Sequence, residues 1–223
     1  EGGYDVLSAW MIIDDADTVR AHGETDFRGL SDLIDPNAAW LEDPANVIVT
    51  VPSEYVLGIT CDVPGRTAGQ IRRALPFVVE EFVTTDIERM HLAHGEIRRG
   101  APVRCSLVDR TLLEDWLACL AELHVHPGFL LPETELLPVA AGQVSVLFDG
   151  DLALVRTPDQ SATVDRDNLA IALNALPAER LLLINGDLAP LERARLDPGV
   201  AITHMETSGL AADSTLGFLA AQA

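Results

Sequence analysis

Clusters of aspartates are the residues of this sequence best suited, by their type, to bind a cation or to exchange protons. Three clusters occur, at Asp14–Asp17, Asp149–Asp151 and Asp165–Asp167. The first lacks the glycine and the final glutamate of a calcium-binding loop. The second has the composition of a hairpin turn, and the third is typical of a charged helix N-terminus. We therefore predict neither a metal ion nor a catalytic carboxylate at these positions.

Histidine and cysteine side chains are spaced poorly for a metal site. On a strand, His91 and His94 would point to opposite faces. His124 and His126 would share a face, but their segment supplies no third ligand, whereas structural zinc takes four convergent nitrogen or sulfur ligands. The cysteines lack CxxC spacing, so we interpret them as small buried residues in a reducing compartment. They are Cys61, Cys105 and Cys119.

The common catalytic signatures are missing from the sequence. It contains no GxSxG or HExxH motif and no glycine-rich phosphate-binding fingerprint. A cysteine nucleophile with a distant histidine stays open, but no local pattern supports one. We predict that the chain is not an enzyme and has no catalytic, cofactor-binding or metal-binding residues.

The charge of the chain restricts its partners. Its 223 residues carry 35 acidic against 15 basic side chains, a formal net charge of −20, and every basic residue is arginine. Such a surface cannot neutralise phosphates and is repelled by anionic lipid headgroups. The absence of lysine excludes Schiff-base chemistry and the lysine of a P-loop. With 48% hydrophobic residues to fill a core, we predict a soluble, acidic, intracellular α/β protein that binds no nucleic acid.

Periodicity in the first half predicts a mixture of strands and helices. Alternating or short apolar runs predict strands at 6–13, 18–25, 47–51, 55–63, 90–94 and 103–109. The run at 47–51 is apolar on both faces, which is typical of a strand covered on both sides. Helices are expected after Asp26 and after the two capping boxes Thr67–Gln70 and Thr111–Glu114.

The helix after Thr67 has an apolar stripe on one face and a proline in its interior. Pro76 predicts a kink or a break, because proline lacks the amide that the helix needs. The stripe consists of Ile71, Leu75, Val78, Val79 and Phe82.

The second half shows a recognisable order of elements. The proline-rich passage 127–142 predicts a boundary between lobes. Beyond it, strands are expected at 144–148, 152–156, 161–164, 181–184 and 200–203, with helices at 165–176, near 187 and at 210–221. Asp149-Gly150, between the first two strands, favours a type I′ hairpin.

This order is that of a ribonuclease-H-like half, and the first half can be read similarly. We therefore predict an α/β, actin-like architecture of two ribonuclease-H-like lobes. Residues 1–142 would form the N-terminal lobe with an inserted subdomain, and residues 143–223 the C-terminal lobe.

Several stretches carry a resemblance to a known family. The most specific is Gly69–Glu81, in which Ala-Leu-Pro-aromatic precedes paired acids, and it continues as Asp86–Ala93. Leu130–Glu133 and Phe148–Arg156 also fit. From about Val47 to Leu183, the chain resembles the cytoplasmic domain of protein L of the bacterial type II secretion system.

The resemblance implies an actin-like domain at the cytoplasmic face of the inner membrane, followed by one transmembrane helix and a small periplasmic domain. We expect the present chain to end short of that membrane anchor. The implied role is to dock the N-terminal domain of the secretion ATPase onto the inner-membrane platform, in support of the export of folded proteins. Other implied partners are protein M and further platform proteins, mainly through parts outside this chain, and a second copy in a possible homodimer.

An actin-like fold raises the question of a nucleotide. The turn that would correspond to a phosphate-binding loop, Phe148–Asp151, carries a second carboxylate where a small neutral residue would be needed, and two carboxylates repel a triphosphate. We predict a degenerate nucleotide site and no cofactor. The alternative is an actin-like nucleotide-binding protein, such as an ATPase, a sugar kinase or an assembly protein of pili or cell division, and it would require intact phosphate turns.

The densest acidic stretch within the resembling segment is Glu80, Glu81, Asp86 and Glu88. Complementary charge steers association, so an acidic domain favours a partner patch rich in arginine or lysine. We predict that these four residues bind the ATPase. The alternative is that they form a solvated helix face without a partner.

Overall fold

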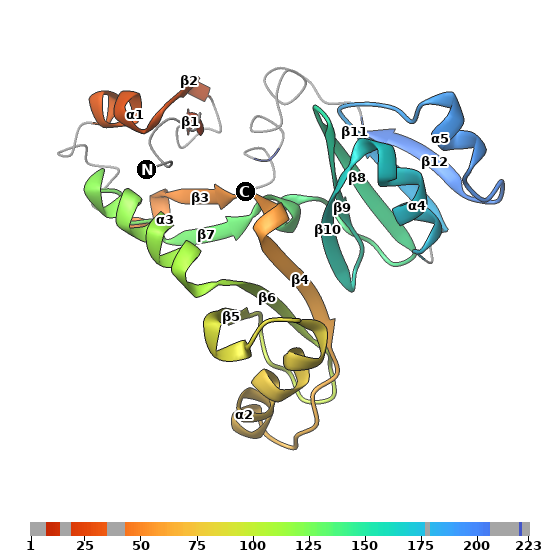
Figure 1. Cartoon of the computed structure of the whole chain (residues 1–223), viewed down its shortest axis with the longest axis horizontal. Helices are drawn as coiled ribbons and strands as arrows, with labels where there is room; N and C mark the ends of the chain where they lie inside the picture. Colours follow the sequence, from red (N-terminus) through yellow and green to blue (C-terminus); the bar gives the residue numbers. More distant parts are fainter. Residues whose placement is uncertain (1–7, 14–18, 35–42, 177–178, 206–218, 220–223) are drawn as a thin grey trace.

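The computed structural model describes residues 8–13, 19–34, 43–176, 179–205 and 219. Three groups of elements can be followed in Figure 1, at the upper left, at the bottom and at the right. Each group has buried apolar side chains of its own, and the right-hand group has them on both faces of its sheet. Among the described residues, no helix is long and apolar enough to cross a membrane.

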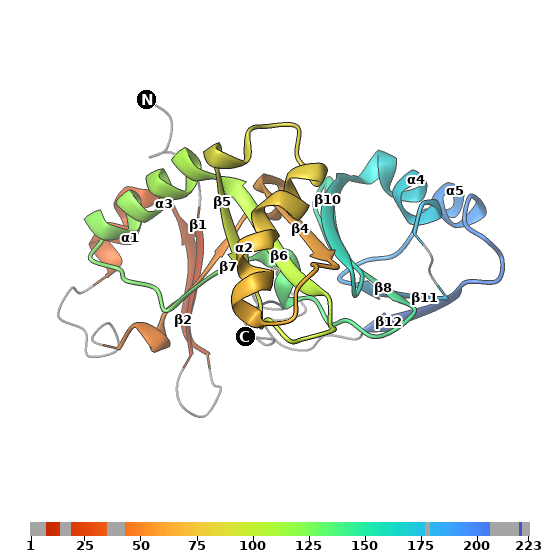
Figure 2. The ribbon, with the colours of Figure 1, turned by 90° about the horizontal axis from the view of Figure 1, so that it is seen from below.

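The C-terminal group is a five-stranded sheet with helices over it (Figure 2). Its elements are β8 (Gln143–Asp149), β9 (Leu152–Arg156), β10 (Gln160–Asp165), η7 (Arg166–Asn168), α4 (Leu169–Asn174), β11 (Arg180–Ile184), α5 (Pro190–Ala194) and β12 (Ala201–Met205). The strand order is β12-β11-β8-β9-β10. Neighbours among β8, β9 and β10 are antiparallel, and β11 pairs in parallel with both β8 and β12. This order confirms the ribonuclease-H-like arrangement predicted for this half.

Alternation along β8 places its side chains on both faces of the sheet, because successive residues of a strand point in opposite directions. Val146 and Phe148 belong to the buried cluster that includes Leu169 of α4. Leu147 belongs to a second cluster, which includes Leu219. The sheet is therefore covered on both faces.

The turn between β8 and β9 differs from the predicted type. A type I′ turn needs a positive φ at both central residues, whereas type II′ needs it only at the first. The register pairs Asp149 with Leu152, so Gly150 and Asp151 are central. Only Gly150 has a positive φ, of 57°. The hairpin is confirmed, but its turn starts one residue later than the Asp-Gly pair indicates and has the type II′ pattern.

The middle group extends the same sheet and carries one long helix. Its elements are β4 (Val56–Cys61), α2 (Ala68–Val79), η4 (Glu80–Phe82), η5 (Ile87–Arg89), β5 (Met90–His94) and β6 (Val103–Asp109). The three strands continue the order as β10-β4-β6-β5, which completes an eight-stranded sheet. The junction is narrow, since β4 and β10 pair only through Gly58 with Ser161 and Ile59 with Gln160.

The cap predicted for α2 is confirmed at Thr67, and of the kink or break predicted at Pro76 the structure excludes the break. The side chain of Thr67 accepts a hydrogen bond from the Gln70 amide at 3.2 Å. In the predicted capping box, the Gln70 side chain would accept a hydrogen bond from the Thr67 amide. It accepts one from the Arg66 amide instead. The helix does not break at Pro76, because it continues to Val79 and its inner face stays buried.

The N-terminal group consists of small sheets and two helices. Its elements are β1 (Ser8–Ile13), β2 (Val19–Thr25), α1 (Phe27–Leu33), η2 (Pro44–Asn46), β3 (Ile48–Val51), η3 (Ser53–Tyr55), α3 (Arg110–Glu122), β7 (Phe129–Pro132) and η6 (Glu133–Leu136). The hairpin of β1 and β2 and the Asp26 cap of α1 are confirmed. β3 pairs in parallel with β7 in a separate two-stranded sheet.

Two expectations for this group are wrong. β3 is not covered on both sides, because Ile48 is 40% exposed. The cap of α3 is Asp109, whose carboxylate accepts from the amides of Thr111 and Leu112, so the Thr111–Glu114 capping box is not used. Aspartate at this position already satisfies two of the free amides of the first turn.

The proline-rich passage 127–142 contains β7 and η6, so it belongs to the ordered fold. β8 begins at Gln143, and the division of the chain into lobes at 142 and 143 stays a prediction. The Asp14–Asp17 cluster lies outside the described residues, as does the helix expected at 210–221 except for Leu219.

Candidate partner-binding surface and buried arginine–glutamate cluster

The four predicted partner-binding residues follow directly after α2 and are all exposed. Glu80 and Glu81 lie in η4, and Asp86 caps η5 by accepting a hydrogen bond from the amide of Glu88 at 3.0 Å. None of the four carboxylates forms a salt bridge with any residue that the structure describes. We call Glu80, Glu81, Asp86 and Glu88 the acidic surface.

Helix periodicity explains which face of α2, the helix before the acidic surface, is buried. Ile71, Leu75 and Val79 are at most 2% exposed and hold the inner face of α2 against β4 and β6. The positions between them then face solvent. The predicted stripe is wrong at its end, because Phe82 is 52% exposed.

Sequence reasoning missed an exposed aromatic side chain on α2 itself. Phe77 is 74% exposed, the highest value among the large apolar side chains of the described residues. Its signal was its spacing, two residues from both Leu75 and Val79, which places it off the buried stripe.

The turn that would correspond to a phosphate-binding loop lies beside a guanidinium that is already engaged. The guanidinium of Arg166 stacks 4.0 Å from the centroid of the Phe148 ring and pairs with Glu192 at 3.0 Å. The Arg166 amide donates to the Asp151 carbonyl at 2.8 Å. The clusters Asp149–Asp151 and Asp165–Asp167 are thus neighbours in space. Within the described part of the chain, no group of three or more histidine, cysteine or acidic side chains could hold a metal ion.

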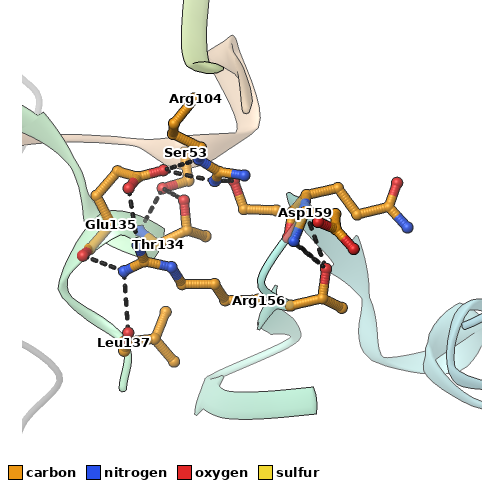
Figure 3. Close-up of polar contacts among 10 residues, drawn as sticks. Ser53, Arg104, Thr134, Glu135, Leu137, Arg156 and Asp159 are labelled. Carbon is orange, nitrogen blue, oxygen red and sulfur yellow. Dashed lines mark hydrogen bonds and ion pairs between the residues drawn. The ribbon is translucent and has the colours of Figure 1, made fainter. Parts of the chain in front are cut away.

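A partly buried carboxylate joins three segments near the junction of β4 and β10 (Figure 3). Glu135 of η6 accepts from Arg104 of β6, with Oε1 at 3.0 Å from Nε and 2.5 Å from Nη2. Its Oε2 accepts from Nη2 of Arg156, in β9, at 2.9 Å. Arg104 also donates to Ser161 of β10 at 2.9 Å, and Arg156 donates to the Leu137 carbonyl at 2.9 Å. Burial lowers the pKa of the Arg156 guanidinium. We call Arg104, Glu135 and Arg156 the arginine–glutamate cluster.

The residues before Glu135 attach the same segment to η3. The Thr134 amide donates to the Ser53 hydroxyl at 2.8 Å, and the Ser53 amide donates to the Glu133 carboxylate at 3.3 Å. Burial raises the pKa of Glu133, and the bond from Ser53 opposes the shift. Sequence reasoning treated this passage as a lobe boundary, and its only signal was the Leu130–Glu133 resemblance.

The predicted histidine pairs and the cysteines form no metal site in the described part of the chain. His91 and His94 are exposed on β5, and His124 has a positive φ of 56°. Cys61 and Cys105 are buried and free, as predicted, and Cys119 is half-buried. Burial raises the pKa of the Cys105 thiol to about 12, which keeps it protonated.

Comparison with known proteins gives one consistent family. A model of the family "Type II secretion system (T2SS), protein L" matches residues 9–188. Type II secretion system protein L of Pseudomonas aeruginosa is 36% identical over 98 residues, which cover 44% of this chain and 25% of that protein. The protein L of Pectobacterium carotovorum is 26% identical over 172 residues, which cover 74% of this chain and 40% of that protein. The matches thus span less than half of these relatives.

Solved structures show the same fold. The cytoplasmic domain of EpsL, an inner membrane component of the type II secretion system of Vibrio cholerae, matches with a TM-score of 0.75 and 19% identity, over 99% of this chain and 90% of that one. A chain of the PilM–PilN type IV pilus biogenesis complex matches with a TM-score of 0.59 and 13% identity, over 90% and 87% of the two chains. The predicted α/β, actin-like fold is confirmed.

Proposed function

The chain belongs to the family of type II secretion system protein L, and from this premise we propose that it is the adaptor that docks the N-terminal domain of the secretion ATPase. In this role it holds the ATPase at the cytoplasmic face of the inner-membrane platform and supports the export of folded proteins. It does so without catalysis of its own.

The acidic surface is the observation that carries the proposal. Its four carboxylates are exposed, lie on consecutive segments and make no ion pair with a described residue. Unpaired charge of one sign attracts a patch of opposite sign and speeds encounter. A partner surface rich in arginine or lysine is therefore the complement of these four carboxylates.

The turn at Asp149–Asp151 supports a non-catalytic role. Carboxylates on both sides of Gly150 repel a triphosphate, and the nearby Arg166 guanidinium already binds Glu192 and stacks on Phe148. Isothermal titration with MgATP tests this step. We expect no binding, and micromolar binding with turnover would instead support the nucleotide-binding alternative.

A binding titration with the N-terminal domain of the cognate secretion ATPase tests the adaptor role. We expect saturable binding at low ionic strength that weakens as salt is added, because the salt screens the exposed charges. Charge reversal by Glu80→Arg and Glu81→Arg should weaken binding at least about tenfold. The matched control is Glu114→Arg with Asp115→Arg, an exposed adjacent pair on α3 that should leave binding unchanged. If the wild-type chain does not bind, the adaptor role is excluded.

Two further associations extend the proposal. Protein M and other platform proteins would contact the full-length protein mainly through parts outside this chain. A homodimer is the other association, and sedimentation of the full-length protein measures it.

A further inference from the structure

Two phenylalanines interrupt the charged surface at the end of α2. Phe77 is 74% exposed and Phe82 is 52% exposed. Aromatic side chains are enriched at the centre of protein interfaces, where they fill pockets of the partner.

Helical spacing joins Phe77 to the acidic surface. Residues three and four apart lie on the same side of a helix, so Phe77 stands one turn before Glu80 and Glu81. The backbone stays helical through this turn, because the amide of Glu80 bonds to the Pro76 carbonyl. Phe82 follows directly in η4. Phe77 thus lies between the exposed Arg73, four residues before it, and the exposed carboxylates of Glu80 and Glu81.

The inner face of α2 makes this arrangement rigid. Leu75 and Val79 alternate with Phe77 and are at most 1% exposed, so the core fixes the helix while Phe77 points away from it. A rigid aromatic anchor loses little conformational freedom when it is buried by a partner.

We propose that Phe77 and Phe82 are the apolar anchors of the acidic surface, and that the ATPase N-terminal domain covers them with an apolar ridge bordered by arginine or lysine. The proposal rests on the adaptor role. It assigns affinity to the two aromatic rings, and it assigns the rate of encounter and the salt dependence to the carboxylates.

The charges favour this occupant over two others. A second copy would bring together two chains that each carry a formal net charge of −20, and like charges in contact are unfavourable. A bilayer containing anionic lipids would repel the same carboxylates. A basic, apolar protein surface complements both the rings and the carboxylates that follow them in the chain.

Titration calorimetry with the purified ATPase N-terminal domain, at low and at high ionic strength, separates the two contributions. We expect Phe77→Ala with Phe82→Ala to weaken binding about 30-fold or more at both ionic strengths, which corresponds to the loss of an interface anchor. Glu80→Gln with Glu81→Gln should weaken binding at low ionic strength and reduce its dependence on salt. The control is Ile171→Ala with Leu191→Ala, two residues that are 66% and 64% exposed on α4 and α5. It should bind as the wild type does.

Each result decides between the two proposals. Wild-type binding together with unchanged binding of the double alanine variant overturns the aromatic anchors and leaves the adaptor role standing. No binding by the wild-type chain removes both. An equal loss in the Ile171 and Leu191 control overturns the assignment to α2. Thermal melting checks that each variant stays folded. We expect unchanged melting temperatures for the two alanine double variants, because the side chains that they remove are exposed.

Discussion

Carboxylates serve opposite purposes in two regions of this molecule. In the arginine–glutamate cluster, Glu135 lies between two guanidiniums and its side chain is 18% exposed. On the acidic surface, four carboxylates are exposed and pair with no described cation. The same chemical group thus holds segments together in one region and stays available for a partner in the other.

The difference shows that burial determines how much a charge contributes to folding. A buried charge loses its hydration and must be compensated by neighbours, whereas an exposed one interacts weakly through water. Glu135 also joins η6 to β6 and β9, which come from distant parts of the sequence. The comparison predicts that changes in the cluster affect stability and that changes on the acidic surface affect binding.

The largest expected effect comes from Glu135→Ala. This change leaves the guanidiniums of Arg104 and Arg156 facing each other without a counter-charge, and their side chains are only 21% and 15% exposed. We expect the free energy of unfolding to fall by about 3–5 kcal/mol. Urea denaturation measures it.

An exposed ion pair supplies the control for Glu135. Glu96 pairs with Arg98, and both side chains are more than two-thirds exposed. Glu96→Ala should leave the denaturation midpoint almost unchanged, because solvent screens this pair. Equal effects of the two substitutions would contradict the role of burial.

The next effect concerns the narrow junction between β4 and β10. A Cβ atom on Gly58 would lie 2.1 Å from the Ser161 hydroxyl and 2.9 Å from Nη2 of Arg104. Gly58→Ala should therefore break the bond between them and lower stability by about 1–3 kcal/mol. Gly69→Ala is the matched control, because its Cβ would meet nothing within 4 Å and alanine suits the first turn of α2. A neutral Gly58→Ala would show that the junction is loosely packed.

Much of the fold could be predicted because its signals are local. The apolar patterns predicted both ends of β5 and of β6 correctly. The order of elements predicted the strand arrangement of the C-terminal sheet. The errors came from a competing local hydrogen bond and from a lack of tertiary cover. Asp109 replaced the expected cap of α3, and β3 lacks the cover that an apolar run indicates.

The two candidate sites also differ in how well the sequence predicted them. The acidic surface was visible as a run of charges, and the structure shows its side chains exposed. The cluster of Arg104, Glu135 and Arg156 was invisible, because its members are separated in sequence and no periodicity links them. The spacing of Phe77 indicated that it lies off the buried face of α2, but the sequence analysis did not identify it as an exposed residue.

A smaller effect depends on pH and on Glu133. Burial raises the pKa of this carboxyl in the folded chain, so its contribution to stability is complete below the unfolded pKa of about 4.3 and is lost as pH rises through the folded pKa. Glu133→Gln removes this titration and keeps an oxygen that can accept the Ser53 amide. We expect the melting temperature of the variant to be higher than that of the wild type at pH 7. Below about pH 4 the two melting temperatures should be equal. A constant difference at all pH values would exclude the linkage.

The smallest expected effect on stability comes from the acidic surface itself. Glu80 and Glu81 follow the last turn of α2, where the helix dipole disfavours negative charge. Glu80→Gln with Glu81→Gln should therefore raise the free energy of unfolding by about 0.3–1 kcal/mol while it weakens ATPase binding. Thermal melting and the binding titration, done on the same samples, compare the two effects. If stability falls instead, the two carboxylates hold the fold, and the contrast with Glu135 fails. If stability rises and binding weakens, these acids lie where they oppose folding, which is expected only of residues that serve a partner.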